Sequence, residues 1–381
     1  MKILLAGTST EKFSGASKCL IELANSLRKK GNMVTVALPK ANGDLEHVLT
    51  DLKISVIIIR EYQCWYKEQT YSGINITYIV KRMMNEINIR KCRKILRLEE
   101  YDIVHVNALT SYVVGKAAIL ENIPVIWHIR EFMEEDLGIS FVNRKWSLGI
   151  LNQASKFIAI SRPIYDKWAK YLNVPIEVIY DGVPIENYYV KEKEKHDYVS
   201  VLLYGRVVKG KGQLFYIKAA EKALKVLNIR CKFFFAGKIE DKNYFEDCMQ
   251  SISSSNCAED IKYIGEINNI KDLLKRTDIV CVCSNKEGFG RVTVEAMLGK
   301  CLVIGAASGA TTELIEDNKN GILYMPNDIE DFTKKIVTCV GHIEAYEEMI
   351  KKGQSYALKN FTSEINADKI ENIYKKMVKR K

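Results

Sequence analysis

The chain has 381 residues, 47% hydrophobic and 27% charged, a balance that excludes an intrinsically disordered chain and is typical of a globular protein. At this length, two domains of common size are the most economical interpretation. The net charge of +10 makes nucleic acid a partner to consider, but the sequence has no nucleic-acid-binding motif and no dense alternation of arginine with aromatic residues. We therefore expect no nucleic acid among its partners.

The first residues and the cysteines favour a soluble, cytoplasmic protein. Residues 1–7 form too short an apolar run for a signal peptide, and no stretch approaches the roughly 18 apolar residues of a membrane-spanning helix. The ten cysteines are scattered, with no Cys-x-x-Cys pair. Reduced thiols are thus favoured over disulfides or metal ligands.

Short β-rich runs alternate with helical patterns in the first half of the chain. An amphipathic helix is expected over residues 17–29. Strands are expected over residues 2–6, 33–38, 54–59, 103–106, 125–129, 156–160 and 177–179. This alternation predicts a parallel, doubly wound α/β sheet.

A second series of the same kind follows a break in this pattern. The break falls at Asp181-Gly182, which reads as a turn at a hinge, and the charged residues 184–198 are expected to form an exposed linker. Further strands are expected over residues 199–204, 232–236, 262–264, 279–283 and 302–305. The predicted architecture is two Rossmann-like, doubly wound domains, residues 1–183 and 199–362, facing a cleft at the carboxyl ends of their strands. A last helix, about residues 363–381, has no strand after it and is expected to pack back on the first domain.

One segment of the second half joins a strand, a glycine-flanked loop and a helix that carries a carboxylate. The apolar run 278–283 leads to Gly288 and Gly290, which bracket an expectedly exposed Phe289. Bare backbone N–H groups at such a helix N-terminus can approach an anionic ligand. Glu287 and Glu295 stand eight residues apart around this loop. For Glu287, a helix-capping anion is the plainer alternative.

Two other loops between a strand and a helix carry binding candidates. Arg206 and Lys211 follow the strand 199–204, and a forked guanidinium with an ammonium suits a diphosphate. A solvated basic loop explains this segment equally well, and the glycine order around Lys211 is not that of a Walker A motif. In the first domain, Gly15 follows the first strand, where it would let the backbone face the cleft.

These candidates belong to a series of short segments that runs along nearly the whole chain. In order they are Ser14-Gly15-Ala16-Ser17, His105-Val106-Asn107, Pro124-Val125-Ile126-Trp127-His128, Tyr180-Asp181-Gly182-Val183, Gly205-Arg206 with Lys211-Gly212, and Glu287 with Glu295. This series resembles the retaining GT-B glycosyltransferases of family 4. The most diagnostic part is the pair of glutamates in the context Glu-Gly-Phe-Gly…Glu-Ala-Met.

The resemblance implies roles for residues of the second domain. Arg206 and Lys211 match the pair that holds the donor's diphosphate and neutralises the leaving group. Glu295 matches the carboxylate that hydrogen-bonds the ribose hydroxyls, and Glu287 matches the first glutamate, which lies against the donor sugar. The amides of the loop frame sugar and phosphate; they are those of Gly288, Phe289 and Gly290.

In the first domain, the resemblance points to His128 and Gly15. His128 matches a histidine that faces the donor sugar, although a satisfied core histidine is the alternative at the end of an apolar strand. Gly15 matches part of the loop that closes over diphosphate and acceptor. For His105, a structural role is favoured. One departure from the family is Ser308-Gly309-Ala310, where a double glycine is usual.

The implied activity is the transfer of a sugar, with retention, from a nucleotide diphosphate sugar to a glycan or lipid-linked acceptor. A UDP-sugar is favoured and a GDP-sugar is the alternative, in polysaccharide, cell-wall or glycolipid synthesis. Cationic side chains and helix-end amides stabilise a departing diphosphate, so no metal or other cofactor is expected. The competing hypotheses are a non-catalytic, glycosyltransferase-like subunit that binds glycan, and a nucleotide-sugar epimerase on the same fold.

A basic helix is expected over residues 81–98. Arg90, Arg93, Lys94 and Arg97 form one stripe, while Met84, Ile87, Ile95 and Leu98 form an apolar side. Such a helix can lie on an anionic membrane surface, which would make the protein peripheral on the inner face of the cell membrane. A solvated helix packed on the sheet is an equal alternative.

Two polar features have plainer explanations. Ser161, followed by Pro163, is expected to cap a helix. The acidic run Glu131, Glu134, Glu135 and Asp136 is expected to be a solvated loop or first helical turn, with a role toward the acceptor as the alternative.

Overall fold

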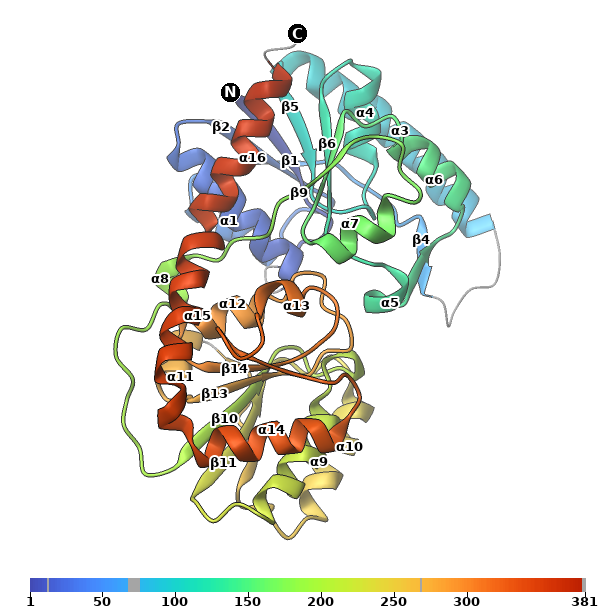
Figure 1. The fold of residues 1–381 in the computed structure, drawn as a ribbon. Helices are drawn as coiled ribbons and strands as arrows, with labels where there is room; N and C mark the ends of the chain where they lie inside the picture. Colours follow the sequence, from blue (N-terminus) through green and yellow to red (C-terminus); the bar gives the residue numbers. More distant parts are fainter. Residues whose placement is uncertain (12–13, 68–75, 268, 379–381) are drawn as a thin grey trace. The chain divides into compact units, whose positions relative to one another are not determined.

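The computed structural model describes residues 1–11, 14–67, 76–267 and 269–378. The chain forms two compact units (Figure 1). The first contains residues 1–182 together with the C-terminal helix, and the second contains residues 183–362.

The first unit is built on a seven-stranded sheet with the order β3-β2-β1-β5-β6-β8-β9, in which every neighbouring pair is parallel. The strand order reverses between β1 and β5, and in such sheets ligands bind beside the carboxyl ends of the strands at this point. The strands are β1 (Lys2–Ala6), β2 (Met33–Leu38), β3 (Ser55–Ile58), β5 (Ile103–Val106), β6 (Val125–Ile129), β8 (Lys156–Ala159) and β9 (Ile176–Val178). A separate antiparallel pair, β4 (Trp65–Lys67) with β7 (Ile139–Phe141), had no signal in the sequence because each strand has only three residues.

Helices cover this sheet and close its core. They are α1 (Gly15–Lys29), α2 (Asp44–Asp51), α3 (Ile76–Glu99), α4 (Val113–Leu120), α5 (Glu134–Leu137), α6 (Arg144–Leu151), α7 (Arg162–Trp168) and α16 (Ser363–Val378). The last of these lies beside α1 (Figure 1), and its Ile370 and Tyr374 are buried in the same core as Leu5 and Leu23. Ser161 accepts a hydrogen bond from the Ile164 N–H at the start of α7, which confirms the predicted cap.

The second unit repeats the plan with a six-stranded parallel sheet in the order β12-β11-β10-β13-β14-β15. Its strands are β10 (Val199–Tyr204), β11 (Cys231–Ala236), β12 (Ile261–Tyr263), β13 (Ile279–Val282), β14 (Leu302–Ala306) and β15 (Ile322–Tyr324). Its helices are α8 (Ile185–Tyr188), α9 (Gln213–Leu224), α10 (Lys242–Ser253), α11 (Ile270–Lys275), α12 (Arg291–Leu298), α13 (Thr311–Leu314), α14 (Ile329–Gly341) and α15 (Glu347–Asn360), with 3-10 turns η2 (Lys209–Lys211) and η3 (Ile343–Tyr346). The predicted fold class, two doubly wound parallel α/β sheets, is confirmed.

Residues 184–198, expected as an exposed linker, begin inside this second unit. They start with α8, and Tyr188 and Val190 are 5% and 1% exposed. The Val190 N–H donates to the carbonyl of Leu298 at 3.1 Å. The charged residues that follow are mostly exposed. Two apolar side chains therefore anchor the front of the segment. Among the described helices, none is both long and apolar enough to cross a membrane.

Candidate active site

The loop between β13 and α12 holds Glu287 at the carboxyl end of the second sheet. Gly290 is the N-cap of α12 and has a φ of 91°, a left-handed conformation that favours glycine. The prediction of an exposed Phe289 is wrong: the side chain is 3% exposed, and its ring packs edge-on against Phe361 with centroids 5.8 Å apart. Burial of a large aromatic ring outweighs the loop's polar surroundings. Phe289 thus anchors the loop in the core.

Lys211 and Glu287 form an ion pair at the tip of this loop. Lys211 Nζ lies 2.6 Å from Glu287 Oε1, and the Glu287 side chain is only 13% exposed. Burial alone would raise the pKa of Glu287, but the Lys211 charge and hydrogen bond, a bond from Ser284 and the Arg206 charge hold it below its ordinary value. Glu287 is therefore an ionised carboxylate at neutral pH.

Two glycines allow this pairing. Gly212 has a φ of 76°, and a Cβ atom there would lie 2.4 Å from the carbonyl oxygen of Cys283, so only glycine lets η2 approach the end of β13. Gly309 has a φ of 54°, and a Cβ atom there would lie 2.6 Å from the carbonyl oxygen of Glu287. The same oxygen accepts a hydrogen bond from the Ala310 N–H at 3.0 Å. The Ser308-Gly309-Ala310 segment thus fixes the Glu287 backbone, a contact between distant segments that the sequence did not reveal.

Arg206 stands in the loop after β10, near this pair. Its Nη1 lies 2.9 Å from Glu240 Oε2, and its side chain is 46% exposed. Because its charge also lowers the pKa of Glu287, both predicted cations act on one carboxylate. Each cation has an acidic partner in this ligand-free structure.

Glu295 lies within α12 and is 5% exposed. Tyr204, at the end of β10, donates its hydroxyl to Glu295 Oε2 at 3.1 Å, and Arg291 Nε lies 3.3 Å from Oε1. Burial raises the pKa of Tyr204 well above its ordinary value, and the Glu295 charge raises it further, so this hydroxyl remains a donor. The sequence gave no reason to single out Tyr204, because its strand position alone does not reveal its partner.

The first unit places His128 at the end of β6 in a fully buried network. Its Nδ1 lies 3.2 Å from Nε2 of His105, on β5, and 3.3 Å from Nη2 of Arg130. His105 Nδ1 lies 2.6 Å from the Tyr374 hydroxyl on α16. Burial and the Arg130 charge lower the pKa of His105 to about 3, and burial with the charges of Arg130 and His105 lowers that of His128 well below its ordinary value.

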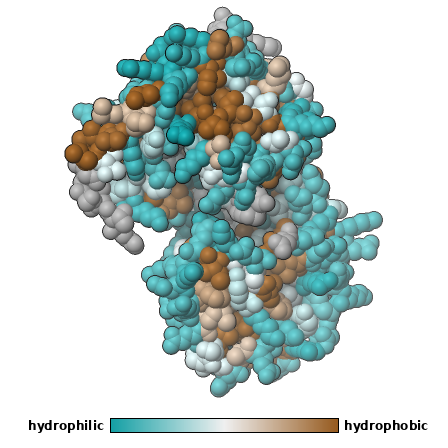
Figure 2. All heavy atoms as spheres, turned by 180° about the vertical axis from the view of Figure 1, so that it is seen from behind, coloured by the Kyte–Doolittle hydropathy of each residue, from teal (hydrophilic) through white to brown (hydrophobic). Residues whose placement is uncertain are grey.

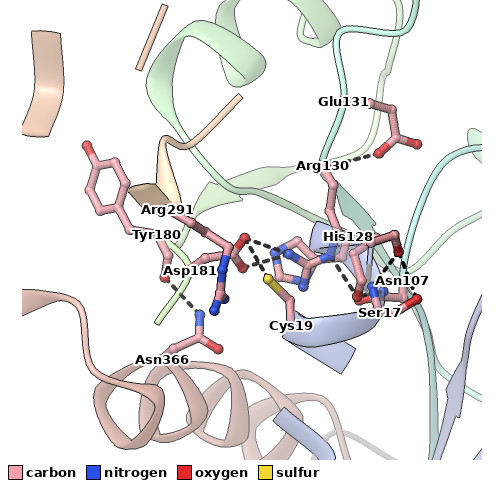
Figure 3. A network of polar contacts seen from close by, with 12 residues as sticks. Ser17, Cys19, Asn107, His128, Arg130, Glu131, Tyr180, Asp181, Arg291 and Asn366 are labelled. Atoms are coloured by element: carbon pink, nitrogen blue, oxygen red, sulfur yellow. Dashed lines mark hydrogen bonds and ion pairs between the residues drawn. The ribbon is translucent and has the colours of Figure 1, made fainter. Parts of the chain in front are cut away.

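Arg130 is the centre of this network, and the sequence analysis missed it. Figure 3 shows Asp181, His128 and Asn107 around its guanidinium. Arg130 Nη1 lies 2.7 Å from both oxygens of Asp181, and Nε donates to Asn107 Oδ1 at 2.9 Å. Both side chains of the ion pair are about 5% exposed. Asp181, expected only as a turn residue, is therefore the buried counter-ion of Arg130, which no local pattern could show.

The remaining candidates of the first unit differ in how they fit. Gly15 is exposed at the first position of α1, and a Cβ atom there would meet nothing within 4 Å, so no contact requires glycine. The expected solvation of Glu131 is wrong, because this side chain is 5% exposed and accepts from the Leu109 N–H. Burial and the nearby Asp136 raise the pKa of Glu131 to about 7.

Neither metal nor disulfide chemistry is suggested by the described part of the chain. Within it, no group of three or more His, Cys, Asp or Glu side chains could hold a metal ion. All ten cysteines are free thiols, and all except Cys257 are buried.

Two family profiles match the chain and together span most of it. Residues 13–187 match Glycosyltransferase Family 4, and residues 185–356 match Glycosyl transferases group 1. The chain is a GT-B glycosyltransferase of this family. The predicted family and the prediction of an enzyme are confirmed.

Relatives of this glycosyltransferase cover most of its length at low identity. An uncharacterized glycosyltransferase of Methanocaldococcus jannaschii is 24% identical over 365 residues, 91% of this chain and 97% of the relative. The Escherichia coli UDP-Gal:alpha-D-GlcNAc-diphosphoundecaprenol alpha-1,3-galactosyltransferase is 24% identical over 323 residues, 80% of this chain and 82% of the relative.

Solved structures share the fold of this glycosyltransferase. Anabaena HepE in complex with UDP superposes with a TM-score of 0.82 at 23% identity, covering 99% of this chain and all of HepE. Staphylococcus aureus TarM, in complex with fondaparinux, alpha-GlcNAc-glycerol and UDP, has a TM-score of 0.75 at 15% identity, covering 98% of this chain and all of TarM. At these identities the likeness establishes the GT-B fold.

Proposed function

We propose that this glycosyltransferase transfers a sugar, with retention, from a UDP-sugar to a glycan or lipid-linked acceptor in polysaccharide, cell-wall or glycolipid synthesis. The observation that carries the proposal is the Lys211–Glu287 ion pair, at 2.6 Å, at the carboxyl end of a parallel sheet. The UDP complex of HepE and the UDP-galactose-dependent E. coli relative support a uridine donor over a guanosine one. The lipid-diphosphate acceptor in that relative's name supports the acceptor class.

In this proposal the residues of the second unit bind the donor. Arg206 and Lys211 neutralise the diphosphate, Glu295 accepts from the ribose hydroxyls, and Glu287 accepts from a hydroxyl of the sugar. The loop amides of Gly288, Phe289 and Gly290 point toward phosphate and sugar. When the donor arrives, its phosphate oxygens replace the carboxylates that Arg206 and Lys211 hold in the ligand-free protein. In the first unit, Gly15 and His128 complete the proposed site.

The proposed chemistry is a front-face substitution. The bond between the anomeric carbon and the phosphate oxygen breaks, and its electron pair leaves with the diphosphate. The acceptor oxygen bonds to the same face of that carbon, and its proton passes to the departing phosphate oxygen. Attack by Glu287 itself is disfavoured, because pairing with Lys211 stabilises the carboxylate charge and weakens it as a nucleophile.

Thermal-shift screening against a panel of UDP- and GDP-sugars tests the donor, because a ligand raises apparent stability according to its affinity. We expect one UDP-sugar to give the largest shift. NMR of the product formed from that donor should show the anomeric configuration of the donor. An inverted product would contradict retention. Glycan binding without transfer or donor hydrolysis would favour the non-catalytic subunit, and inversion at C2 of the free donor would favour the epimerase.

We also propose that transfer needs no metal, since two cations already face the leaving group. Activity should therefore be unchanged in EDTA. A loss in EDTA that Mg²⁺ or Mn²⁺ restores would contradict this part of the proposal.

Finally, we propose that α3 binds an anionic membrane surface. Its inward side carries Tyr78, Asn85, Ile89, Cys92 and Leu96, whereas its first turns expose apolar side chains, with Ile76 78% and Met83 63% exposed. Figure 2 shows apolar side chains gathered on this side of the first unit. The predicted basic stripe is shorter than expected, because Arg93 and Arg97 pair with Glu121. The exposed basic residues that continue the apolar turns are Arg90, Lys91 and Lys94.

This arrangement places an apolar half and a cationic half on one exposed helix face, which suits insertion between lipid tails beside anionic headgroups. Sedimentation with phosphatidylglycerol vesicles should show binding at low salt that weakens at high salt. Lys91→Glu with Lys94→Glu should weaken it at least about fivefold per charge, since each lysine near such a surface contributes about 1 kcal/mol. Lys334→Glu with Lys352→Glu, in the second unit, is the matched control. Absence of low-salt binding would contradict the proposal.

A further inference from the structure

The protons of the buried histidine pair can be assigned from Arg130. A guanidinium donates hydrogen bonds and cannot accept them. Arg130 Nη2 lies 3.3 Å from His128 Nδ1, so this nitrogen faces a donor and must carry a lone pair. Because both ring pKa values are far below neutral, His128 is a neutral ring. Its single proton is therefore on Nε2.

The same reasoning continues along the network. His105 Nε2 lies 3.2 Å from the His128 lone pair, so His105 donates and its proton is also on Nε2. His105 Nδ1 is then an acceptor, and the Tyr374 hydroxyl at 2.6 Å is its donor. Burial raises the pKa of Tyr374 well above its ordinary value, so this proton is retained. Every hydrogen bond of the network has one consistent direction.

One donor is left over at the end of this chain. His128 Nε2 is fully buried, and within the described residues it has no hydrogen-bond partner. Leaving a buried donor unpaired costs free energy that a ligand acceptor would recover. The atom belongs to the last turn of residues in β6, at the carboxyl edge of the sheet where ligands bind in this architecture.

We propose that Arg130, His105 and Tyr374 are positioning residues that hold His128 with its proton on Nε2, so that it donates a hydrogen bond to an oxygen of the donor sugar. This inference rests on the proposed function and adds the direction of the contact: His128 serves as a donor and not as a base. It also gives the C-terminal helix a part in the site, because α16 supplies Tyr374 from 269 positions away in the sequence.

Two-bond ¹H–¹⁵N correlation spectra of the full chain with ¹⁵N-labelled histidine test the assignment without any activity measurement. Five histidines contribute signals, and variants at 105 and 128 identify the two of interest. We expect both rings to show the pattern of a neutral ring protonated on Nε2 throughout the neutral pH range. A His128 ring protonated on Nδ1, or on both nitrogens, would overturn the proposal even if transfer is active.

Tyr374→Phe tests the relay itself. It keeps the ring and removes the donor to His105, so the His105 Nδ1 signal should shift and kcat should fall about fivefold, the scale of one neutral hydrogen bond. Tyr101→Phe, at another buried tyrosine of the first unit, should leave the histidine spectra unchanged. For the donor role, His128→Gln, which can present an amide N–H, should retain more transfer than His128→Phe. Equal loss in both variants, or an unshifted His105 signal, would contradict the inference. An inactive wild-type protein with the expected spectra would instead contradict the proposed function.

Discussion

Lys211 Nζ lies 2.6 Å from Glu287 Oε1, and this pair joins two loops whose residues are 76 positions apart. Burial by itself would disfavour the Glu287 charge, and the paired ammonium overcomes that cost. A ligand that brings its own anionic oxygens to Lys211 therefore also frees a carboxylate to meet a hydroxyl group. The same contact can in this way bind a phosphate and a sugar.

Glu287→Gln should reduce kcat about 10²- to 10³-fold, the usual scale for losing one charge-stabilising contact in a transition state. The fold should persist, because the amide still fits the space of the carboxylate. Initial rates with the best donor and circular dichroism provide the measurements. Glu316→Gln, at an exposed carboxylate that pairs only on the surface with Lys319, is the matched control and should keep wild-type rates. Near-wild-type turnover of Glu287→Gln would remove it from the site.

Arg206→Ala should abolish detectable transfer with little change in stability. Its side chain is 46% exposed, and surface ion pairs such as that with Glu240 contribute at most about 1 kcal/mol. Arg206→Lys should retain part of the activity, because it keeps the charge but loses the forked geometry that suits a diphosphate. Arg276→Ala, at an exposed arginine paired with Glu194, controls for the loss of one surface charge. A donor KM that does not change in either Arg206 variant would contradict its role.

Gly309→Ala should destabilise the second unit and impair transfer together. The residue has a φ of 54°, and a Cβ atom would lie 2.6 Å from one backbone atom of Glu287 and 2.8 Å from another. Strain of this kind costs about 1–3 kcal/mol, and relief of the clash would displace Glu287. Denaturant unfolding and initial rates measure the two effects. Gly341→Ala, at a helical glycine with nothing within 4 Å of its Cβ position, should be neutral or stabilising. Identical behaviour of the two variants would mean that the contact with Glu287 is not needed.

Glu131 should make stability fall as pH rises. Burial and the Asp136 charge raise its pKa from 4.5 to about 7 in the folded protein. Between these values the folded state binds more protons than the unfolded state, so the free energy of unfolding decreases with rising pH, by up to about 3 kcal/mol. Glu131→Gln removes this dependence and should be more stable than wild type at about pH 8, with the difference vanishing near about pH 4.5. Denaturant titrations at both pH values, with Glu330→Gln as the exposed control, measure it. An unchanged or growing advantage at low pH would refute the assignment.

The glycines and acids of the βα loops allowed much of the second half-site to be predicted. Parallel strands end at one edge, so Arg206, Lys211 and Glu287, which follow two such strands, were expected together, and Lys211 and Glu287 indeed form an ion pair. The partners from elsewhere were not predictable. Tyr204, Gly309 and Glu240 contact these residues through side-chain directions and loop conformations that have no local sequence pattern.

Phe289 and Asp181 show where local reasoning failed. A phenylalanine between two glycines resembled an exposed loop residue, yet Phe361, 72 positions away, provides a buried surface for it. An Asp-Gly pair resembled a simple turn, yet Arg130 makes Asp181 a buried counter-ion. In both cases the partner lies far away in the sequence.

The sequence by itself determined that this chain forms two parallel α/β units and belongs to the family 4 glycosyltransferases, because strand and helix periodicities and the glycine-acid loops are local properties. Only the tertiary structure decided which charges pair, which rings are buried and which nitrogen of His128 carries the proton. Those properties depend on burial and on hydrogen-bond partners that folding brings together, such as Tyr374 and His105, and neither is written in the neighbouring residues.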